Sequence, residues 1–289
     1  MSELAYVNGA YVPLAEATIS IEDRGFQFAD GVYEVIATYG GTPYAVSEHM
    51  QRLQQSLEAL QISYCPNRDC LVEKIEHGIG ACGFGEVLVY IQITRGTAPR
   101  HHEFPHPESD PTLVMTFKEL KRLPQQLYRE GVKVISVPDI RWGRCDIKSI
   151  ALLPNILAKQ AAHEKGAFEA LLVDDEGRVT EGSSTSAFCV RAGTLYTAPG
   201  GTHILPSVTR KILLELAGSL GLAVRESFST LEQFKEADEV LLAGTTTEAV
   251  GVVEIDGVRI GDGRPGNITR TLRNAFLRAI EKRAEDGPR

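Results

Sequence analysis

The 289-residue chain has few cysteines, and their arrangement excludes the common cysteine-based scaffolds. Its five cysteines are an odd number, are scattered along the chain and form no C-x-x-C pair. This spacing matches neither a zinc ribbon nor a disulfide framework. We therefore expect reduced thiols and a cytoplasmic protein, which at this length can bury a large apolar core without cross-links.

The sequence also lacks long apolar runs and an excess of positive charge. No run approaches the roughly 18 apolar residues that span a bilayer, and the N-terminus shows no basic-then-apolar signal pattern. The 38 acidic residues outnumber the 30 basic ones, which gives a net charge of −8. Because a nucleic-acid-binding surface usually needs a basic excess, we expect neither a membrane nor a nucleic-acid partner.

The order of the expected helices and strands excludes several common enzyme folds. No Walker motif follows a strand, and strands do not alternate one-for-one with helices. A doubly wound sheet or a (β/α)8 barrel is therefore a poor match. The pattern instead predicts a mixed α+β protein.

Local signals divide this α+β chain into two parts. Asn8-Gly9 predicts a hairpin turn, Ser47 is expected to cap a helix over residues 47–62, and residues 87–94 read as a buried strand. Residues 121–131 lose the apolar pattern and include Pro124. We predict an N-terminal α/β domain at 1–120, a linker at 121–131 and a C-terminal α/β domain at 132–289.

A loop at residues 95–106 is the first candidate for chemistry. It contains two arginines and three histidines within twelve residues. Arginine offers a planar fork of donors, so the loop could bind a carboxylate or a phosphate. A solvated surface loop remains open, as does a metal site that uses His101, His102 and His106, whose spacing matches no familiar ligand pattern.

A lone lysine and a lone acid are the next candidates. Lys148 stands in an apolar neighbourhood just before an expected helix. A lysine there usually reaches out to water, but burial would lower its pKa and suit it to Schiff-base chemistry. Glu181 ends a strand-like segment beside four hydroxyl residues, which by default is a polar loop.

Two segments could hold an anion. Residues 205–210 open a helix, whose free N–H groups attract phosphate, and residues 244–247 follow a strand and could form a similar nest. Ordinary helix capping explains either segment alone. Together, the lysine, the acid, the anion cradles and the arginine fork match what pyridoxal phosphate and an amino acid require.

These residues carry a resemblance to a known family. The motifs are Asn8-Gly9, Arg24-Gly25, residues 28–34, 95–105 and 144–148, Glu181-Gly182-Ser183-Ser184, residues 205–210, Thr245-Thr246 and residues 254–257. In order and spacing, over nearly the whole chain, they resemble the class IV pyridoxal-phosphate aminotransferases, and among them the bacterial D-amino-acid transaminases. The resemblance implies the two-domain fold of that family, pyridoxal 5'-phosphate as cofactor and a homodimer.

The resemblance also implies a role for each matching residue. Lys148 is the expected Schiff-base lysine and proton shuttle, and Glu181 is expected to face the pyridine nitrogen. The other residues implied to bind the cofactor are Arg52, Ser184, Leu205, Val208, Thr209 and Thr245. Those implied to bind the substrate are Tyr33, Arg100, His102 and Thr246, the first three as a trap for its α-carboxylate that reaches across a dimer interface.

Two positions depart from the pattern of the family. Gly244 stands where close relatives tend to have serine, which removes one hydrogen bond to the phosphate, and Ser186 stands where many members have asparagine. The expected reaction is ping-pong transamination of D-amino acids, for example D-alanine plus 2-oxoglutarate giving pyruvate plus D-glutamate. The alternatives are a branched-chain L-aminotransferase or an aminodeoxychorismate lyase of the same fold, a non-catalytic protein that binds the cofactor, and a metal-dependent hydrolase built on the histidine loop.

Overall fold

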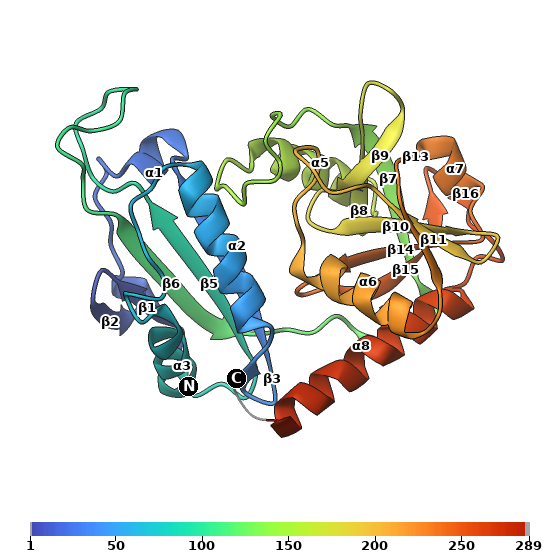
Figure 1. The fold of residues 1–289 in the computed structure, drawn as a ribbon, viewed down its shortest axis with the longest axis horizontal. Helices are drawn as coiled ribbons and strands as arrows, with labels where there is room; N and C mark the ends of the chain where they lie inside the picture. The colour runs from blue at the N-terminus through green and yellow to red at the C-terminus, as the bar shows by residue number, and fades with distance from the viewer. Residues whose placement is uncertain (1, 287–289) are drawn as a thin grey trace. The chain divides into compact units, whose positions relative to one another are not determined.

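The computed structural model describes residues 2–286, which fold into two compact units (Figure 1). The first unit is formed by the chain up to Lys121 together with the short segment Ile147–Ala151. The second is formed by Arg122–Asp146 and by the chain from Leu152 onward. The chain therefore enters the second unit, returns to the first for five residues, and then completes the second.

An antiparallel sheet with strand order β2-β1-β6-β5-β3-β4 is the framework of the first unit. Its strands are β1 (Leu4–Val7), β2 (Ala10–Pro13), β3 (Gly31–Tyr39), β4 (Thr42–Pro43), β5 (Val87–Thr94) and β6 (Thr112–Glu119). Its helices are the 3-10 turn η1 (Leu14–Glu16), α1 (Arg24–Phe28), α2 (Val46–Ala59) and α3 (Leu71–Cys82). Apolar side chains of α2 and α3 share one buried core with the strands.

Two local predictions can be compared directly with this unit. The Asn8-Gly9 hairpin is confirmed: Val7 pairs with Ala10, and both turn residues have positive φ (44° and 111°). The expected cap at Ser47 is wrong, because α2 begins one residue earlier, at Val46. Ala45 occupies the cap position with φ of 55° and provides no side-chain hydrogen bond, so the backbone turn rather than a hydroxyl starts this helix.

The second unit is built on a larger mixed sheet. Its main path has strand order β12-β11-β10-β14-β15-β7-β8-β9-β13, and β16 pairs with β15. The strands are β7 (Val132–Pro138), β8 (Glu169–Val173), β9 (Arg178–Gly182), β10 (Ser186–Arg191), β11 (Thr194–Thr197), β12 (Ala223–Glu226), β13 (Ser229–Thr230), β14 (Glu239–Gly244), β15 (Glu248–Ile255) and β16 (Val258–Arg259). The pairs β11–β12, β15–β7 and β7–β8 are parallel, and the others are antiparallel.

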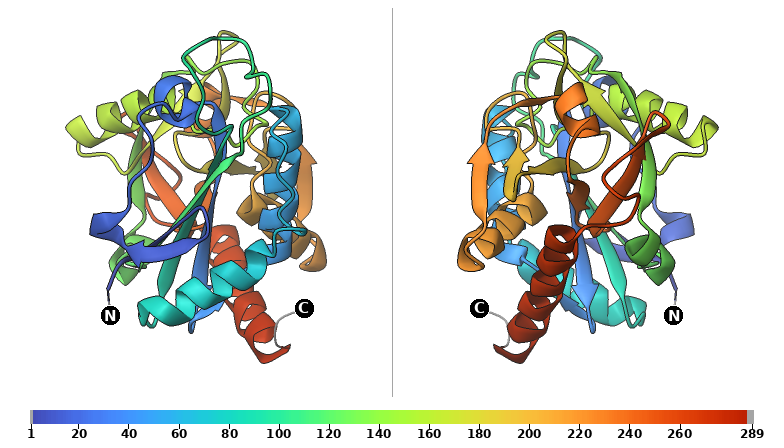
Figure 2. Two further views of the ribbon diagram at one scale, coloured as in Figure 1. Left: turned by 90° about the vertical axis from the view of Figure 1, so that its left-hand side faces the viewer. Right: turned by 90° about the vertical axis from the view of Figure 1, so that its right-hand side faces the viewer.

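Helices complete the second unit. They are α4 (Gln125–Glu130), α5 (Leu153–Glu164), α6 (Val208–Ser219), α7 (Leu231–Lys235) and α8 (Asn267–Asp286). Helix α8 packs against β14, β15 and α6, and is the red helix in both views of Figure 2. The predicted linker segment, residues 121–131, includes α4, whose Tyr128 is buried among apolar side chains of this unit. None of the described helices combines the length and apolarity that crossing a bilayer would require.

Candidate active site

Hydrogen bonds of the Lys148 backbone attach this residue to the first unit. Its N–H donates to the Ser56 hydroxyl at 3.1 Å, and its carbonyl accepts the N–H of Tyr33 at 3.0 Å. The neighbouring Ile147 is buried in the core of this unit, and Ser149 forms a β-bridge with Val32. The backbone around Lys148 is therefore fixed to β3 and to α2 by contacts on both sides.

The side chain of Lys148 is half-buried rather than fully exposed. Its Nζ lies 4.1 Å from the centroid of the Tyr33 ring, and Tyr33 in turn stacks on Tyr90 with ring centroids 5.7 Å apart. Burial raises the pKa of Tyr90 to about 12, so its phenol stays neutral near physiological pH. The structure thus brings together two of the sequence-predicted residues, Lys148 and Tyr33.

Arg52, a predicted phosphate ligand, belongs to a buried ion pair that sequence reasoning missed. Glu34 is fully buried on β3, and its carboxylate accepts the Arg52 Nε at 2.7 Å and Nη2 at 2.8 Å. His49 Nδ1 lies 2.7 Å from the same carboxylate. His49 and Arg52 are three residues apart on α2 and therefore share one face of the helix. Glu34 thus fixes the orientation of the Arg52 guanidinium.

Charge explains how this buried cluster is tolerated. Burial alone would raise the pKa of Glu34, but Arg52 and His49 outweigh that effect and hold the pKa of Glu34 well below its usual range. Burial, together with the nearby positive charges of Arg52 and Lys148, outweighs the attraction of Glu34 and lowers the pKa of His49. The stable state is consequently an ionised Glu34–Arg52 pair beside a neutral imidazole.

We predict that Glu34→Gln destabilises the fold by about 3 kcal/mol at pH 7, because it leaves the Arg52 charge buried without a counter-charge. Since the folded pKa of Glu34 is depressed, its stabilising contribution is present above the unfolded value of about 4.3 and is lost as the pH falls below it. Urea unfolding of both proteins at pH 7 and pH 4 measures this. The difference in the free energy of unfolding between the parent and Glu34→Gln should be smaller at pH 4 than at pH 7. An equal or larger difference at pH 4 would contradict a depressed pKa for Glu34.

The predicted substrate residues Arg100 and His102 lie on the long loop between β5 and β6. Both side chains are exposed, whereas Arg95 at the start of the loop is buried and paired with Asp30. Arg95 therefore anchors the loop, and Arg100 remains as the exposed guanidinium. In the described part of the chain, no three His, Cys, Asp or Glu side chains gather as metal ligands.

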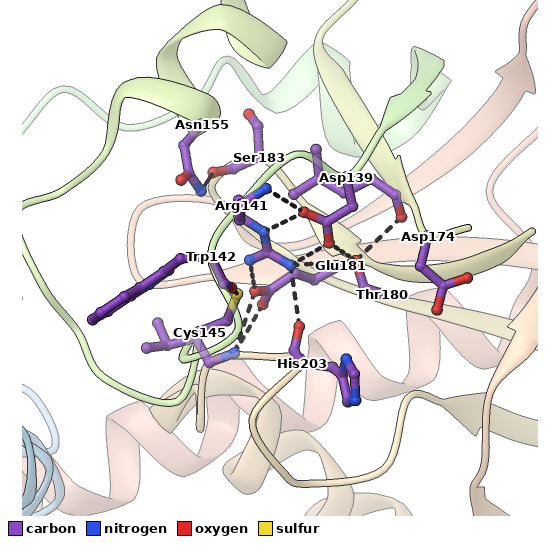
Figure 3. Close-up of polar contacts among 12 residues, drawn as sticks. Asp139, Arg141, Trp142, Cys145, Asn155, Asp174, Thr180, Glu181, Ser183 and His203 are labelled. Carbon is purple, nitrogen blue, oxygen red and sulfur yellow. Dashed lines mark hydrogen bonds and ion pairs between the residues drawn. The ribbon is translucent and has the colours of Figure 1, made fainter. Parts of the chain in front are cut away.

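Glu181 lies at the centre of a polar network in the second unit (Figure 3). Its buried carboxylate accepts a hydrogen bond from Arg141 Nη1, and the N–H of Leu205 donates to it at 3.2 and 3.4 Å. Arg141 also donates to Asp139 Oδ1 from Nε at 2.9 Å and to Oδ2 from Nη2 at 2.7 Å. The hydroxyl of Thr180 donates to the same Asp139 at 2.7 Å. The network joins two predicted residues directly, Glu181 and Leu205, and adds Arg141 and Asp139, which the sequence did not reveal as partners.

Two opposing effects set the charge of Glu181. Burial is the larger effect and raises the pKa of its carboxyl above the usual value, although the guanidinium of Arg141 and the N–H of Leu205 act in the opposite direction. Arg141 itself loses solvation, but Asp139 and Glu181 outweigh that loss and raise its pKa. Arg141 is therefore the group that favours the ionised carboxylate at this buried position.

Ser184 is oriented by a second buried acid. Glu169 is fully buried on β8, and its carboxylate accepts the Ser184 hydroxyl at 2.6 Å as well as the hydroxyl of Ser183. The Ser183 carbonyl accepts the side-chain amide of Asn155 at 2.8 Å. These bonds fix the turn after β9 with the Ser184 side chain partly accessible, although Glu169 carries no sequence signal beyond being an acid inside an apolar strand.

The two predicted anion cradles lie at the start of α6 and after β14. Ser207 caps α6, its side chain accepting the N–H of Arg210 at 3.2 Å, and Val208 and Thr209 form the buried first turn. N–H groups in a first helical turn have no carbonyl partner within the helix and attract anions. Thr245 is half-buried and Thr246 is exposed in the turn that joins β14 to β15.

The two positions that depart from the family pattern lie close to this turn. An added Cβ at Gly244 would meet nothing nearer than 3.6 Å, the Ser184 carbonyl and the Thr185 methyl group. The Ser186 hydroxyl, by contrast, is buried without a hydrogen-bond partner among the described residues. Gly244 therefore leaves room for a side chain, and Ser186 leaves a buried polar atom unsatisfied.

We predict that Gly244→Ser tightens binding of pyridoxal phosphate about three- to tenfold, the value of one added hydrogen bond. The measurement is the dissociation constant of the cofactor by titration of the cofactor-free protein. Gly85→Ser is the control, because an added Cβ there likewise causes no clash and meets nothing within 4 Å. Equal constants for Gly244→Ser and the parent protein would rule out a hydroxyl contact at this position.

Comparisons with known proteins give these residues a context. The amino-transferase class IV family matches residues 31–255. The chain belongs to the class IV aminotransferase family. Relatives named D-alanine aminotransferase include one from Staphylococcus haemolyticus, 38% identical over 96% of this chain and 98% of its own, and one from Bacillus licheniformis, 38% identical over 94% and 95%.

Solved structures of other class IV aminotransferases have the same mixed α+β fold, as predicted. The branched-chain amino acid aminotransferase of Escherichia coli aligns with a TM-score of 0.89 and 25% identity, covering 97% of this chain and 95% of its own. The enzyme of the same name from T.th., solved with pyridoxamine 5'-phosphate, aligns with a TM-score of 0.86 and 28% identity, covering 99% and 96%. Class IV aminotransferases use pyridoxal 5'-phosphate as cofactor.

The donor set of this chain suits that cofactor. The Arg52 guanidinium and the first-turn N–H groups of α6 are phosphate donors, and the buried Glu181 carboxylate is a partner for a protonated ring nitrogen. Lys148 supplies a primary amine.

Proposed function

We propose that the protein is a D-amino-acid transaminase that converts D-alanine and 2-oxoglutarate into pyruvate and D-glutamate. The observation that carries the proposal is full-length similarity, at 38% identity, to relatives named D-alanine aminotransferase. The exposed Arg100 and His102 on one loop are consistent with it, since both could meet a substrate carboxylate.

Cofactor binding is assigned to the residues that the family resemblance implies. Arg52, the first-turn N–H groups of Val208 and Thr209, and Thr245 would hold the phosphate. Ser184 and Leu205 would contact the cofactor as well, Leu205 packing against its ring, and Glu181 would keep a negative charge at the ring nitrogen. When bound, pyridoxal phosphate supplies an electron sink for the electron pair that is left when the α-proton of an amino acid departs.

Lys148 has two tasks in this proposal. Its amine would hold the cofactor until the substrate amine displaces it. Once free and neutral, it would carry the proton from the substrate Cα to C4′ of the cofactor. Its fixed backbone, hydrogen-bonded to Ser56 and Tyr33, limits the positions that the amine can reach.

Substrate recognition is assigned to Tyr33, Arg100, His102 and Thr246. A guanidinium binds a carboxylate through two parallel hydrogen bonds, and the hydroxyl and imidazole donors add direction. Holding the α-carboxylate fixes which face of the substrate the lysine meets, so these residues would set the handedness of the amino acid.

The protein is further proposed to act as a homodimer in the cytoplasm. Helix α5 exposes Leu153, Ile156 and Leu157 along one face, and Ile140 and Trp142 of the same unit are exposed too. Exposed apolar side chains along one face of a helix commonly mark an interface. Sedimentation of the cofactor-bound protein tests this part of the proposal, since a monomer would contradict it.

A direct assay separates this function from its alternatives. The protein is mixed with D-alanine or L-valine and a keto-acid acceptor, and the product is followed over time. Faster turnover of L-valine would favour a branched-chain aminotransferase, and release of pyruvate from aminodeoxychorismate would favour the lyase. Absorption of bound cofactor without reaction with any amino acid would indicate a protein that only binds it, and stoichiometric metal would indicate the hydrolase.

A further inference from the structure

The loop that carries Arg100 and His102 is anchored by a buried charge cluster in the first unit. Asp30 Oδ2 accepts Arg24 Nε and Arg95 Nε, each at 2.8 Å, and Asp30 Oδ1 accepts Arg95 Nη2 at 3.1 Å. Burial would raise the pKa of Asp30, but the two arginines outweigh it and hold the pKa below its usual value. One ionised carboxylate therefore fixes two guanidinium groups.

Arg24, which Asp30 holds in place, forms hydrogen bonds to the backbone of the loop. Its Nη1 donates to the carbonyl of His101 at 2.7 Å and to that of Glu103 at 3.3 Å, and its Nη2 donates to the carbonyl of His102 at 3.4 Å. Three consecutive carbonyls are thus bound by a single buried side chain. This arrangement fixes the main chain directly beside Arg100 but leaves the exposed side chains themselves unrestrained.

Phe28 supplies the contact to those side chains. It is the last residue of α1, the helix that begins at Arg24. Its ring lies 4.8 Å from the Arg100 Cζ, and it meets the His102 ring edge-on with centroids 5.6 Å apart. The Arg24 Cζ lies 5.0 Å from the same ring. A single aromatic ring therefore contacts both predicted carboxylate ligands and the residue that holds their backbone.

We propose that Phe28 is a positioning residue for recognition of the substrate carboxylate, acting through Arg100 and His102. A guanidinium prefers the face of an aromatic ring, and an exposed arginine otherwise samples many rotamers. The Phe28 ring limits both side chains to a narrow set of orientations before substrate arrives, which lowers the entropy lost on binding. The inference rests on the proposed function, because it assumes that Arg100 and His102 bind the substrate carboxylate.

The test compares Phe28→Leu, Phe28→Tyr and Arg100→Ala in the cofactor-bound enzyme, with KM and kcat measured for D-alanine and 2-oxoglutarate. Leucine keeps an apolar side chain but has no ring face, whereas tyrosine keeps the ring. Phe28→Leu should raise KM for both substrates about tenfold, equivalent to about 1.4 kcal/mol, with kcat changed less than about threefold. Phe28→Tyr should have the same KM as the parent protein.

Two controls separate positioning from general damage. Phe26→Leu changes an exposed phenylalanine on the same helix and should leave KM unchanged. The absorption spectrum of the bound cofactor should be the same in all variants. When Phe28→Leu is added to Arg100→Ala, the rise in KM should be smaller than in the parent, because one of the two side chains positioned by the ring is already gone.

The results distinguish failure of this inference from failure of the proposed function. Arg100→Ala should raise KM about 10- to 100-fold, as expected when a charged hydrogen-bond donor is lost. If it does so while Phe28→Leu behaves like the parent, or lowers kcat with KM unchanged, the role of Phe28 alone is overturned. If Arg100→Ala leaves KM unchanged, the proposed role of Arg100 is wrong and the inference falls with it.

Discussion

Lys148→Ala is expected to abolish turnover, reducing kcat by at least about 10⁴-fold, because both the covalent link to the cofactor and the proton carrier are lost. The measurement is multiple-turnover transamination of D-alanine by the purified variant. Lys165→Ala is the matched control, since it removes an exposed lysine at the end of α5 and should leave the rate unchanged.

The assignment of Lys148 can also be tested without an activity assay. Treating the cofactor-bound parent protein with borohydride reduces the bond between lysine and cofactor, and peptide mapping then locates the label. We expect the label on the peptide that contains Lys148. Appreciable multiple turnover by Lys148→Ala, or a label on another lysine, would remove the residue from this role.

Glu181→Gln is expected to lower kcat about 10³-fold. A carboxylate about 4 Å from a protonated ring nitrogen is worth about 4 kcal/mol at an effective dielectric of 20, close to three pKa units. Glutamine keeps the shape of the side chain and loses the charge. Buried Glu181 also pairs with Arg141, so the variant must first be shown by thermal unfolding to be folded at the assay temperature.

Glu181→Asp is the control variant, because it keeps the negative charge on a shorter side chain. Its kcat should be higher than that of Glu181→Gln and lower than that of the parent protein. The quantity to compare is kcat for D-alanine in the two variants and the parent. Should Glu181→Gln retain kcat within about threefold of the parent, the carboxylate would not be the group that controls the ring nitrogen.

Regular elements of this fold were largely predictable because their signals are local. The strand β5 was expected at residues 87–94 and lies at Val87–Thr94, since its run of β-branched and aromatic residues favours a buried strand. The first hairpin was predictable because Asn8 and Gly9 tolerate positive φ. Helix α2 shows the limit: its start depends on the backbone turn at Ala45, for which Ser47 was a misleading signal.

The charged clusters were not predictable, because their partners are far apart in the sequence. Glu34 pairs with Arg52 across 18 residues, and Arg141 with Glu181 across 40. A single sequence shows such residues only as isolated charges, for which a position on the surface is the usual interpretation. Arg95 illustrates the consequence, since it was grouped with Arg100 as a ligand and is instead a buried anchor of the loop.

The brief return of the chain at Ile147–Ala151 limits how this protein could be recombined with its relatives. A gene fragment that ends at Lys121 would encode a six-stranded sheet without Lys148 and without the Ser149 bridge to Val32. Chimaeras that exchange one unit between aminotransferases would therefore have to transplant this pentapeptide with the N-terminal portion, so the crossover points fall at three places in the coding sequence rather than one.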